Sequence, residues 1–458
     1  MAVLLDYEKI PDAVRTVINK IDRAGYEAWL VGGCVRDLCL GLIPKDFDLA
    51  TNARPEQIQN LFVRHFLTGA RHGTVTVLWQ GMSFEITTFR SESSYSDARR
   101  PDQVIFRNTI AEDLARRDFT INSLAWRPDC GLLDLYDGLS DLQQGVLRTV
   151  GDPQARFGED LLRLLRAVRF AVNYNLAPVP ALVQAAAEHA RSLGQLSRER
   201  MIAEMITILC APHVHQLKSF AGSGIMAETA RLFFAVRTDD RLLCHNLSRL
   251  VQPDLPESLR LPLFYLCSVA PDLQVASLRH ALGRIFVGSS GKAVQDLFMR
   301  EARLPRRLAR DAQAILYLYY LRLLIPPDRP LSVVSQCRLF RLLARHGGLK
   351  RNELHAPVEM TARLLKLSLG AVFSEPALSL EVCRAVPLTL EELALNGHQL
   401  QIAGLPSGPA LGNILQRLLS RTIQEPRLNQ PADLMAIALF WLSSTDQPRR
   451  ARNETKLS

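Results

Sequence analysis

The stretch Leu30-Val-Gly-Gly-Cys-Val-Arg-Asp37, followed by Pro44-Lys-Asp-Phe-Asp-Leu-Ala-Thr51, decides the fold of this chain. An apolar run that ends in two glycines and continues into a helical pattern predicts a strand, a turn and a helix. At that turn Gly32 and Gly33 expose backbone N–H groups at a helix N-terminus, and Arg36 adds a charged fork. The stretch therefore predicts a phosphate-binding turn. It is not the dinucleotide fingerprint, because the third glycine is missing.

Asp46 and Asp48 are separated by one residue on a predicted strand. Because side chains alternate along a strand, both carboxylates leave one face, with Cα atoms about 6.5–7 Å apart. Such a pair can hold two Mg²⁺ ions, which activate an attacking hydroxyl and stabilise a leaving pyrophosphate in phosphoryl transfer. Glu85, on a later predicted strand, is the candidate third carboxylate, although an acid in that alternation can equally point to water.

Short β-rich runs alternate with turns from Tyr26 to about Trp126. Beyond Asp141, segments with apolar residues at i, i+3 and i+4 predict helices for the remaining two thirds of the chain. The predicted strands are Ala28–Val31, Asp46–Ala50, Thr74–Trp79, Ser83–Phe89 and Gln103–Phe106.

The composition is that of a globular protein with several domains: 458 residues, 48% hydrophobic and 22% charged, with a net charge of +9. This excludes disorder, fibres and coiled coils as the main state. The most apolar run, Ala314–Ile325, is interrupted by Arg322 and is predicted to be a buried helix rather than a membrane span. The N-terminus lacks a signal-peptide pattern, so we expect a cytoplasmic protein without membrane contact.

The eight cysteines show no Cys-x-x-Cys pair, so we expect free thiols and no structural zinc. Most of the basic residues are arginine, which suits phosphate contacts and favours a nucleotide or nucleic-acid partner.

Gly32-Gly-Cys-Val-Arg-Asp37 with Lys45-Asp-Phe-Asp48 resembles the head motif of the polymerase-β-like nucleotidyltransferases. Within that superfamily the chain resembles class II tRNA nucleotidyltransferases, the CCA-adding enzymes, and the related bacterial poly(A) polymerases. Three further blocks resemble the family in order and spacing: residues 113–122, 157–170 and 196–204. The likeness is dense from about residue 24 to 210. It reappears at residues 395–400 and 408–415, where His398 and Gln399 depart from a family pattern that has Asp at one of them.

The resemblance implies an α+β protein with a polymerase-β-like mixed-sheet catalytic head at residues 1–140. An elongated all-helical neck (141–210), body (211–350) and tRNA-binding tail (351–458) would follow it.

The resemblance also implies that Asp46 and Asp48 bind the catalytic Mg²⁺. It places Gly33, Arg36 and Arg117 at the phosphates and sugar of the incoming nucleotide.

A helix spanning Glu159–Arg169 would read the base. Asp160 and Arg163 lie three residues apart and share a helix face. Their carboxylate and guanidinium match the amino donor and ring acceptor that cytosine and adenine share, and reject guanine and uracil. Arg166 and Arg169 continue a basic stripe that is expected to contact phosphate or RNA. Arg200 and Glu204 are interpreted as residues that brace this helix.

Two segments bear on the reaction. Thr68–Val77 resembles the CCA-adding branch, and Arg90–Pro101 resembles a flexible loop that enzymes adding only C residues lack. We therefore predict Mg²⁺-dependent addition of C, C and then A to tRNA from CTP and ATP, without a nucleic-acid template. The alternatives are an A-adding enzyme with a separate CC-adding partner, a poly(A) polymerase, and an inactive RNA-binding relative. The sequence does not indicate an oligomeric state.

Overall fold

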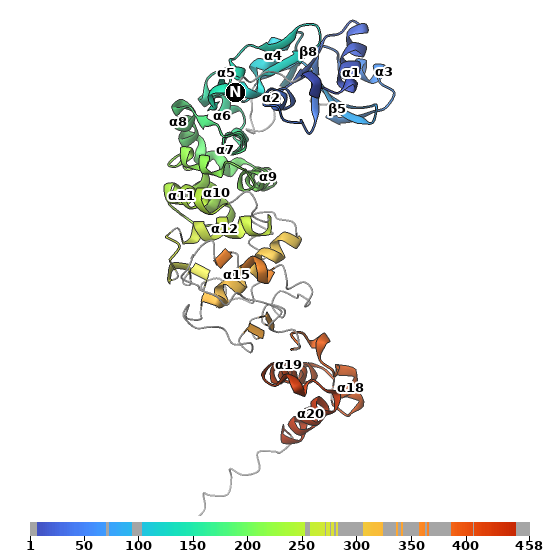
Figure 1. Ribbon diagram of the computed structural model, residues 1–458, viewed down its shortest axis with the longest axis vertical. Coiled ribbons are helices and arrows are strands. Elements are labelled where there is room, and N and C mark those ends of the chain that lie inside the picture. The colour runs from blue at the N-terminus through green and yellow to red at the C-terminus, as the bar shows by residue number, and fades with distance from the viewer. Residues whose placement is uncertain are drawn as a thin grey trace, which may run out of the picture. The chain divides into compact units, whose positions relative to one another are not determined.

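The computed structural model describes residues 7–69, 73–93, 103–251, 257–270, 306–323, 386–405 and 407–445, with short pieces between 272 and 365. The chain forms two compact units, Met1–Arg260 and Leu261–Ser458 (Figure 1). A mixed sheet near the N-terminus precedes a largely helical region, so the predicted α+β class is confirmed. The division into head, neck, body and tail stays a prediction.

The first unit is built on a seven-stranded sheet in the order β3-β4-β5-β2-β1-β8-β9. Strands β2 and β5 are parallel, and the other neighbours are antiparallel. The predicted strands Ala28–Val31, Thr74–Trp79 and Gln103–Phe106 are confirmed residue for residue. The strand predicted to begin at Asp46 begins one residue later, at Phe47. The strands are β1 (Ala28–Val31), β2 (Phe47–Thr51), β3 (His65–Gly69), β4 (Thr74–Trp79), β5 (Met82–Thr88), β8 (Leu124–Arg127) and β9 (Gly131–Asp134).

The predicted strand, turn and helix are found where β1 leads into α2 (Gly33–Cys39). Gly32 at the turn has φ 78° and ψ −130°, a backbone conformation that residues other than glycine avoid. A Cβ at Gly32 would also lie 2.5 Å from Nη1 of Arg117. Glycine at this position is therefore required both by the backbone and by the neighbouring arginine.

A second, two-stranded antiparallel ribbon joins β6 (Arg90–Ser93) to β7 (Gln103–Phe106). The segment that resembles the family's flexible loop falls mostly at residues 94–102, outside the described residues. Residues 70–72 of the segment Thr68–Val77, which resembles the CCA-adding branch, also lie outside the described residues.

Helices cover the sheet and continue the first unit beyond it (Figure 1). In the region predicted to be all helical, β10 (Val146–Leu147) pairs with β11 (Ala177–Pro178), so that prediction is wrong at this short parallel ladder. The helices around the sheet are α1 (Asp12–Arg23), α3 (Pro55–Leu61), α4 (Ile110–Ala115) and α5 (Gly138–Gln144). Those that follow are α6 (Pro153–Glu159), α7 (Leu162–Tyr174), α8 (Pro180–His189), α9 (Arg198–Leu209), α10 (Ile225–Phe234) and α11 (Asp240–Leu250). Helix α12 (Glu257–Val269) contains the boundary between the two units.

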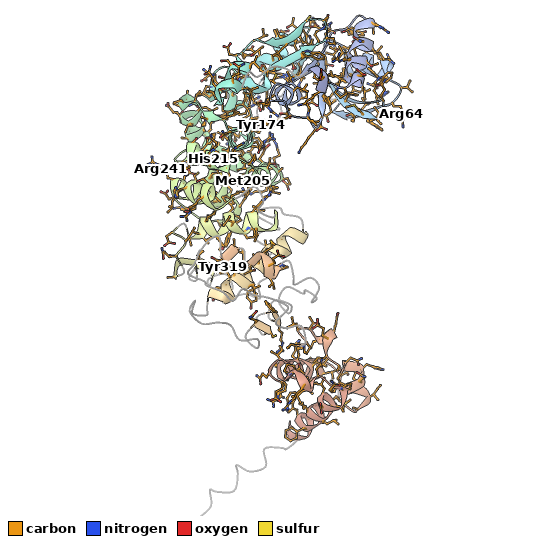
Figure 2. All side chains as sticks on the ribbon, viewed as in Figure 1. Arg64, Tyr174, Met205, His215, Arg241 and Tyr319 are labelled. Atoms are coloured by element: carbon orange, nitrogen blue, oxygen red, sulfur yellow. The ribbon has the colours of Figure 1, made fainter. Side chains whose placement is uncertain are left out.

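The second unit contains α15 (Arg306–Leu323), whose central part is buried and includes Tyr319 (Figure 2). This confirms the buried helix predicted from residue 314 onward, as far as the described residues reach. Near the C-terminus α18 (Gly397–Ile402), α19 (Pro409–Gln424) and α20 (Pro431–Thr445) pack around Leu400, Leu418 and Leu434. Among the described residues, no helix combines the length and the apolar content that a membrane crossing requires.

The departure from the family pattern at Gln399 has a structural role. Asn396 Oδ1 accepts from the Gln399 backbone N–H and Gln399 Oε1 accepts from the Asn396 N–H, both at 2.9 Å, which caps α18.

Six of the cysteines are free, as predicted. Cys337 is in a disulfide, so the expectation of free thiols throughout is wrong there.

Candidate active site

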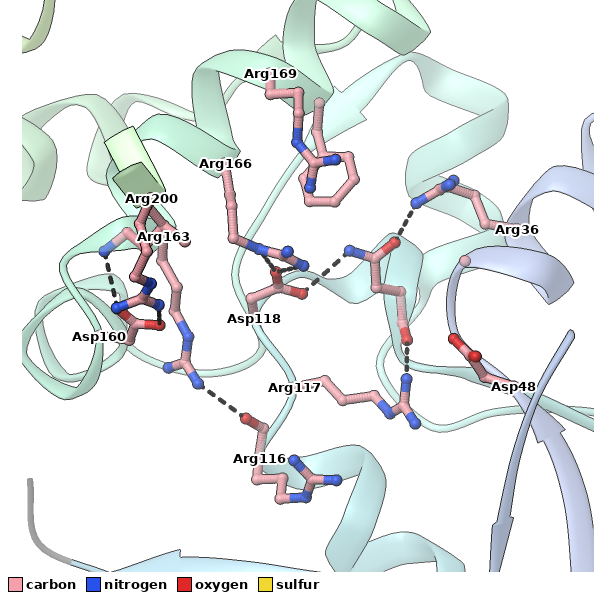
Figure 3. Close-up of a pocket in the computed structure, with 14 residues that line it drawn as sticks. Arg36, Asp48, Arg116, Arg117, Asp118, Asp160, Arg163, Arg166, Arg169 and Arg200 are labelled. Carbon is pink, nitrogen blue, oxygen red and sulfur yellow. Dashed lines mark hydrogen bonds and ion pairs between the residues drawn. The ribbon is translucent and has the colours of Figure 1, made fainter. Parts of the chain in front are cut away.

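A pocket of about 500 Å³ lies in the first unit, between the sheet and helices α7 and α9 (Figure 3). Eight residues that the sequence predicted line it: Gly33, Arg36, Asp48, Arg117, Asp160, Arg163, Arg166 and Arg169. Gly32, Asp46 and Glu85 are not among its lining residues. The lining residues that the site prediction did not include are Arg116, Asp118, Asn122, Leu162, Phe170 and Arg200.

The parallel pair β2 and β5 places Asp48 directly opposite Glu85. Phe47 is buried while Asp46 and Asp48 are exposed, so the alternation predicted for these two acids is present, although Asp46 precedes the strand. Glu85 is also exposed, on the face that Asp48 occupies. The three predicted carboxylates therefore share one open side of the sheet.

The Asp48 carboxylate is crowded although its side chain is open to the pocket. Surrounding protein atoms reduce its hydration, and Glu85 and then Asp46 add repulsion, which together raise the pKa of Asp48 to about 6 against a smaller opposing effect of Arg117. Excess negative charge at this position fits a cation.

The carboxylates do not form a ready-made cage for that cation. Among the described residues, no three Asp, Glu, His or Cys side chains are close enough together to hold a metal ion by themselves. Mg²⁺ is commonly bound by one or two carboxylates together with substrate phosphates, and Asp46 and Asp48 suit that arrangement.

Arg117 is held beside the glycine turn by a buried acid. Asp113 of α4 accepts from Arg117 at 3.1 Å and from Arg116 at 2.6 Å. Burial opposes ionisation of Asp113, but the two guanidinium groups outweigh it and hold its pKa below the usual value. Nη1 of Arg117 also donates to the backbone carbonyl of Asn122 at 3.3 Å. The guanidinium is thereby fixed against Gly32.

The Arg36 side chain is buried, and its guanidinium donates four hydrogen bonds to protein acceptors. Its Nε and Nη2 donate to Asp37 Oδ1 at 3.0 and 2.7 Å. Nη1 donates to Asn122 Oδ1, and Nη2 donates to the Tyr174 hydroxyl. The predicted phosphate fork is thus positioned by residues of α2, of the turn at Asn122 and of α7.

Asp118 joins the head to α7. Its Oδ2 accepts from Arg166 Nε at 2.7 Å, and its Oδ1 accepts from Asn122 Nδ2 at 3.1 Å (Figure 3). Burial works against its charge, but Arg166, with help from Asn122 and Arg163, lowers the pKa of Asp118 to about 2. Asp118 lies in a motif that resembles the family, but its ion-pair partner Arg166 is 48 residues away, too far along the chain for the pairing to be predicted.

The prediction of a single helix over Glu159–Arg169 is wrong, because the helix is interrupted at Asp160. Helix α6 ends at Glu159 and α7 begins at Leu162, while Asp160 has an extended backbone. Asp160 Oδ1 accepts from the Leu162 N–H at 3.0 Å. A short acidic side chain competes for backbone N–H groups in this way and favours a helix boundary over a helix interior.

Because of this break, Asp160 and Arg163 line one pocket but have different side-chain partners. Asp160 Oδ2 accepts from Arg200 Nη2 of α9 at 2.8 Å. Arg163 pairs with Glu159 and donates to the backbone carbonyl of Arg156 at 3.0 Å. Arg200, interpreted from the sequence as a bracing residue, both holds Asp160 and lines the pocket.

Arg169 completes this side of the pocket. Its Nε lies 2.7 Å from Oε2 of Glu204 in α9, an ion pair that is not aligned as a hydrogen bond. Burial raises the pKa of Glu204, and Arg169 opposes that effect. The bracing predicted for Glu204 thus corresponds to a contact with Arg169.

The chain is similar to known proteins along most of its length. Residues 28–148 match the family model of the poly A polymerase head domain. The CCA-adding enzyme of Lacticaseibacillus paracasei is 35% identical over 424 residues, which are 92% of this chain and 94% of that protein. The CCA-adding enzyme of Levilactobacillus brevis is 50% identical over 208 residues, 45% of this chain, and this alignment spans only about half of the relative, 52%.

A solved structure agrees over nearly the whole chain. The crystal structure of the Bacillus stearothermophilus CCA-adding enzyme in complex with CTP is 27% identical and has a TM-score of 0.66. The match covers 95% of this chain and 98% of that one.

Proposed function

Because this chain belongs to the class II CCA-adding enzymes, tRNA nucleotidyltransferases with a poly A polymerase head domain, we propose that it adds C, C and A to tRNA 3′ ends. The substrates are CTP and ATP, and no nucleic acid serves as template. One observation carries the proposal: the Asp48 carboxylate and a group of arginines face the same pocket. A tRNA substrate also fits the cytoplasmic location expected from the sequence.

The pocket has the charge that a nucleoside triphosphate requires. Seven arginines and three aspartates line it, and guanidinium groups bind phosphate oxygens through paired N–H donors. Arg117 and Arg36 lie beside the glycine turn, and Arg166 and Arg169 face it from α7. In the proposed reaction the tRNA 3′-hydroxyl attacks the α-phosphate and pyrophosphate leaves, while these arginines hold the triphosphate in place.

Asp46 and Asp48 would hold Mg²⁺, and the bound ion would supply charge stabilisation to the transferring phosphate. The chain's own contribution is the pair of carboxylates on the open side of β2, held in alternation by buried Phe47 and Leu49. Glu85, opposite Asp48, adds negative charge to the site rather than completing a three-ligand group.

Asp160 and Arg163 are proposed to read the base. Arg200 and the Leu162 N–H fix the two oxygens of Asp160, and Glu159 fixes Arg163. Each polar group is therefore oriented before the nucleotide arrives. This favours cytosine and adenine, because only these present an amino donor beside a ring acceptor on the Watson–Crick edge.

The helices beyond the head are proposed to bind the tRNA acceptor arm through phosphates and shape. The net charge of +9 agrees with such a partner. Binding should then weaken steeply with salt, since each phosphate contact releases counterions.

The test is a gel assay of the purified protein with Mg²⁺ on two tRNAs, one ending at the discriminator base and one ending in CC. Each tRNA receives CTP, ATP or both. Three-nucleotide extension of the first tRNA that requires both nucleotides supports the proposal. Addition of a single A confined to the CC-ended tRNA would instead identify an A-adding partner enzyme, and a long A ladder would identify a poly(A) polymerase.

A further inference from the structure

Three arginines of the pocket surround one aromatic ring. The guanidinium carbons of Arg36, Arg166 and Arg169 lie 5.3, 5.3 and 4.6 Å from the ring centroid of Phe170. Arg166 and Arg169 precede Phe170 on α7, whereas Arg36 comes from α2, far away in the sequence. The ring of Phe170 is thus a shared contact between the two sides of the pocket.

The ring is fixed by its own packing. Phe170 is buried, with 4% of its surface exposed, and meets Phe119 edge to face at 5.4 Å. Tyr174 lies one turn further along α7 (Figure 2). Its ring centroid is 6.2 Å from that of Phe170, and the two ring planes are tilted by 30°. The two rings, here called the aromatic pair, form one apolar surface on α7.

Tyr174 extends this contact to Arg36. The Arg36 guanidinium lies 4.1 Å from the Tyr174 ring centroid, and its Nη2 donates to the Tyr174 hydroxyl. The same hydroxyl donates to Asp37 Oδ1 at 3.1 Å. Tyr174 therefore contacts Arg36 in two ways: its ring stacks on the guanidinium, and its hydroxyl accepts a hydrogen bond from it.

Stacking of this kind suits an anion site. Three neighbouring guanidiniums repel one another, and the electron-rich face of an aromatic ring offsets part of that repulsion. Acids provide the remainder, because Asp37, Asp118 and Glu204 each pair with one of the three arginines. Stacking occupies the face of a guanidinium and none of its five N–H donors, so those N–H groups that do not already bond to protein acceptors remain for a phosphate.

We propose that the aromatic pair Phe170 and Tyr174 is the positioning element that aligns Arg36, Arg166 and Arg169 for the triphosphate of the incoming nucleotide. This inference rests on the proposed function and names residues that act through the arginines rather than on substrate. It predicts a defect in nucleotide affinity that is separable from loss of stability.

The test compares Phe170→Leu with Phe157→Leu, each measured for KM and kcat with CTP and with ATP on tRNA. Phe157, on α6, is also buried but packs against His189 of α8, so its replacement removes a similar core ring away from these three arginines. Phe170→Leu should raise both nucleotide KM values about tenfold, since it removes contacts to three guanidiniums, with a smaller change in kcat. Phe157→Leu should lower the unfolding temperature by a comparable amount and leave KM unchanged.

Two variants at the half-buried Tyr174 keep the test decisive if Phe170→Leu does not fold. Tyr174→Phe keeps the ring and should stay within about threefold of the wild-type KM, whereas Tyr174→Leu should exceed it. Unchanged KM in Tyr174→Leu, or equal KM increases in the Phe157 and Phe170 variants, would overturn the inference. If the wild-type protein extends no tRNA, the proposed function fails; CTP dissociation constants, measured by titration, then decide the inference with the same comparisons.

Discussion

Two sides of one pocket are prepared in opposite ways. On the sheet side, Asp46, Asp48 and Glu85 form a carboxylate edge, of which Asp48 lines the pocket. Reduced hydration, and then repulsion by Glu85 and Asp46, raises the pKa of Asp48. On the helix side, Arg163, Arg166 and Arg169 form an arginine face in which every guanidinium already has an acidic partner, Glu159, Asp118 or Glu204. The carboxylate edge carries excess negative charge, whereas the arginine face is oriented before any ligand binds. Removing a charge should therefore have opposite effects on stability at the two sides.

The largest effect is expected at the carboxylate edge. Asp48→Asn should reduce nucleotide addition by more than about 10³-fold, because a phosphate-transferring site that loses a metal ligand loses its main charge stabilisation. The same variant should unfold at a slightly higher temperature than the wild type near pH 7, because it removes a repelled charge. Initial rates on tRNA and thermal unfolding check both statements.

Asp12→Asn at the exposed start of α1 is the matched control. It should keep the wild-type rate and should not gain stability, because its charge favours the helix N-terminus. A cooperative unfolding transition with residual activity near the wild-type level in Asp48→Asn would remove Asp48 from the metal site.

The second-largest expected effect is a loss of stability when an acidic partner of the arginine face is removed. Asp118→Asn should destabilise the protein by about 3–5 kcal/mol at pH 7, because it leaves Arg166 partly buried without its counter-charge. Chemical denaturation measures this. Asp141→Asn is the control, since Asp141 is also buried but its partner Arg148 is mainly exposed, and its loss should be smaller. A stability of Asp118→Asn equal to that of the wild type would mean that the arginine face is not organised by its acids.

The two acids also differ in how they respond to pH. The pKa of Asp118 is lowered to about 2, so its ionisation stabilises the fold above pH 4 by about 2 kcal/mol, and this is lost as pH falls towards 2. The pKa of Asp48 is raised to about 6, so its ionisation opposes folding, and stability falls as pH rises from 4 towards 6. Denaturation curves of the wild type and the two Asn variants between pH 3 and 8 separate these contributions.

The sequence predicted the sheet side of the pocket better than the helix side. Gly32, Gly33, Asp46 and Asp48 lie within one local motif, where alternation and turn chemistry act between near neighbours. Asp118 forms its ion pair with Arg166, 48 residues away, and Asp160 forms its ion pair with Arg200, 40 residues away. No sequence periodicity predicts contacts at such separations. The predicted helix through Asp160 failed because i, i+3 spacing cannot reveal that a carboxylate caps the next helix instead of continuing the last one.

A smaller effect is expected at the turn that connects the two sides. Gly32→Ala should destabilise the protein by about 1–3 kcal/mol, because alanine is strained at this φ and its Cβ would displace Arg117. Gly33→Ala is the control: its Cβ would only touch Arg36 at 3.5 Å, so the fold should keep wild-type stability. Equal unfolding temperatures for the two variants would show that Arg117 is free to leave the turn.

The smallest expected effect concerns base choice. Asp160→Asn keeps the oxygen that caps α7 but replaces a carboxylate with an amide that can also donate, so uracil and guanine should no longer be rejected by their carbonyl groups. The ratio of kcat/KM for CTP over UTP should fall by about 10- to 100-fold. Stability should also fall, because the new amide turns an N–H group towards Arg200 Nη2 and leaves that guanidinium without its counter-charge. Asp152→Asn is the control, because Asp152 also accepts from backbone N–H groups at the start of a helix, α6, but does not line the pocket. Unchanged discrimination in Asp160→Asn would mean that Arg163 or another group reads the base, and would leave the arginine face with a role in phosphate binding only.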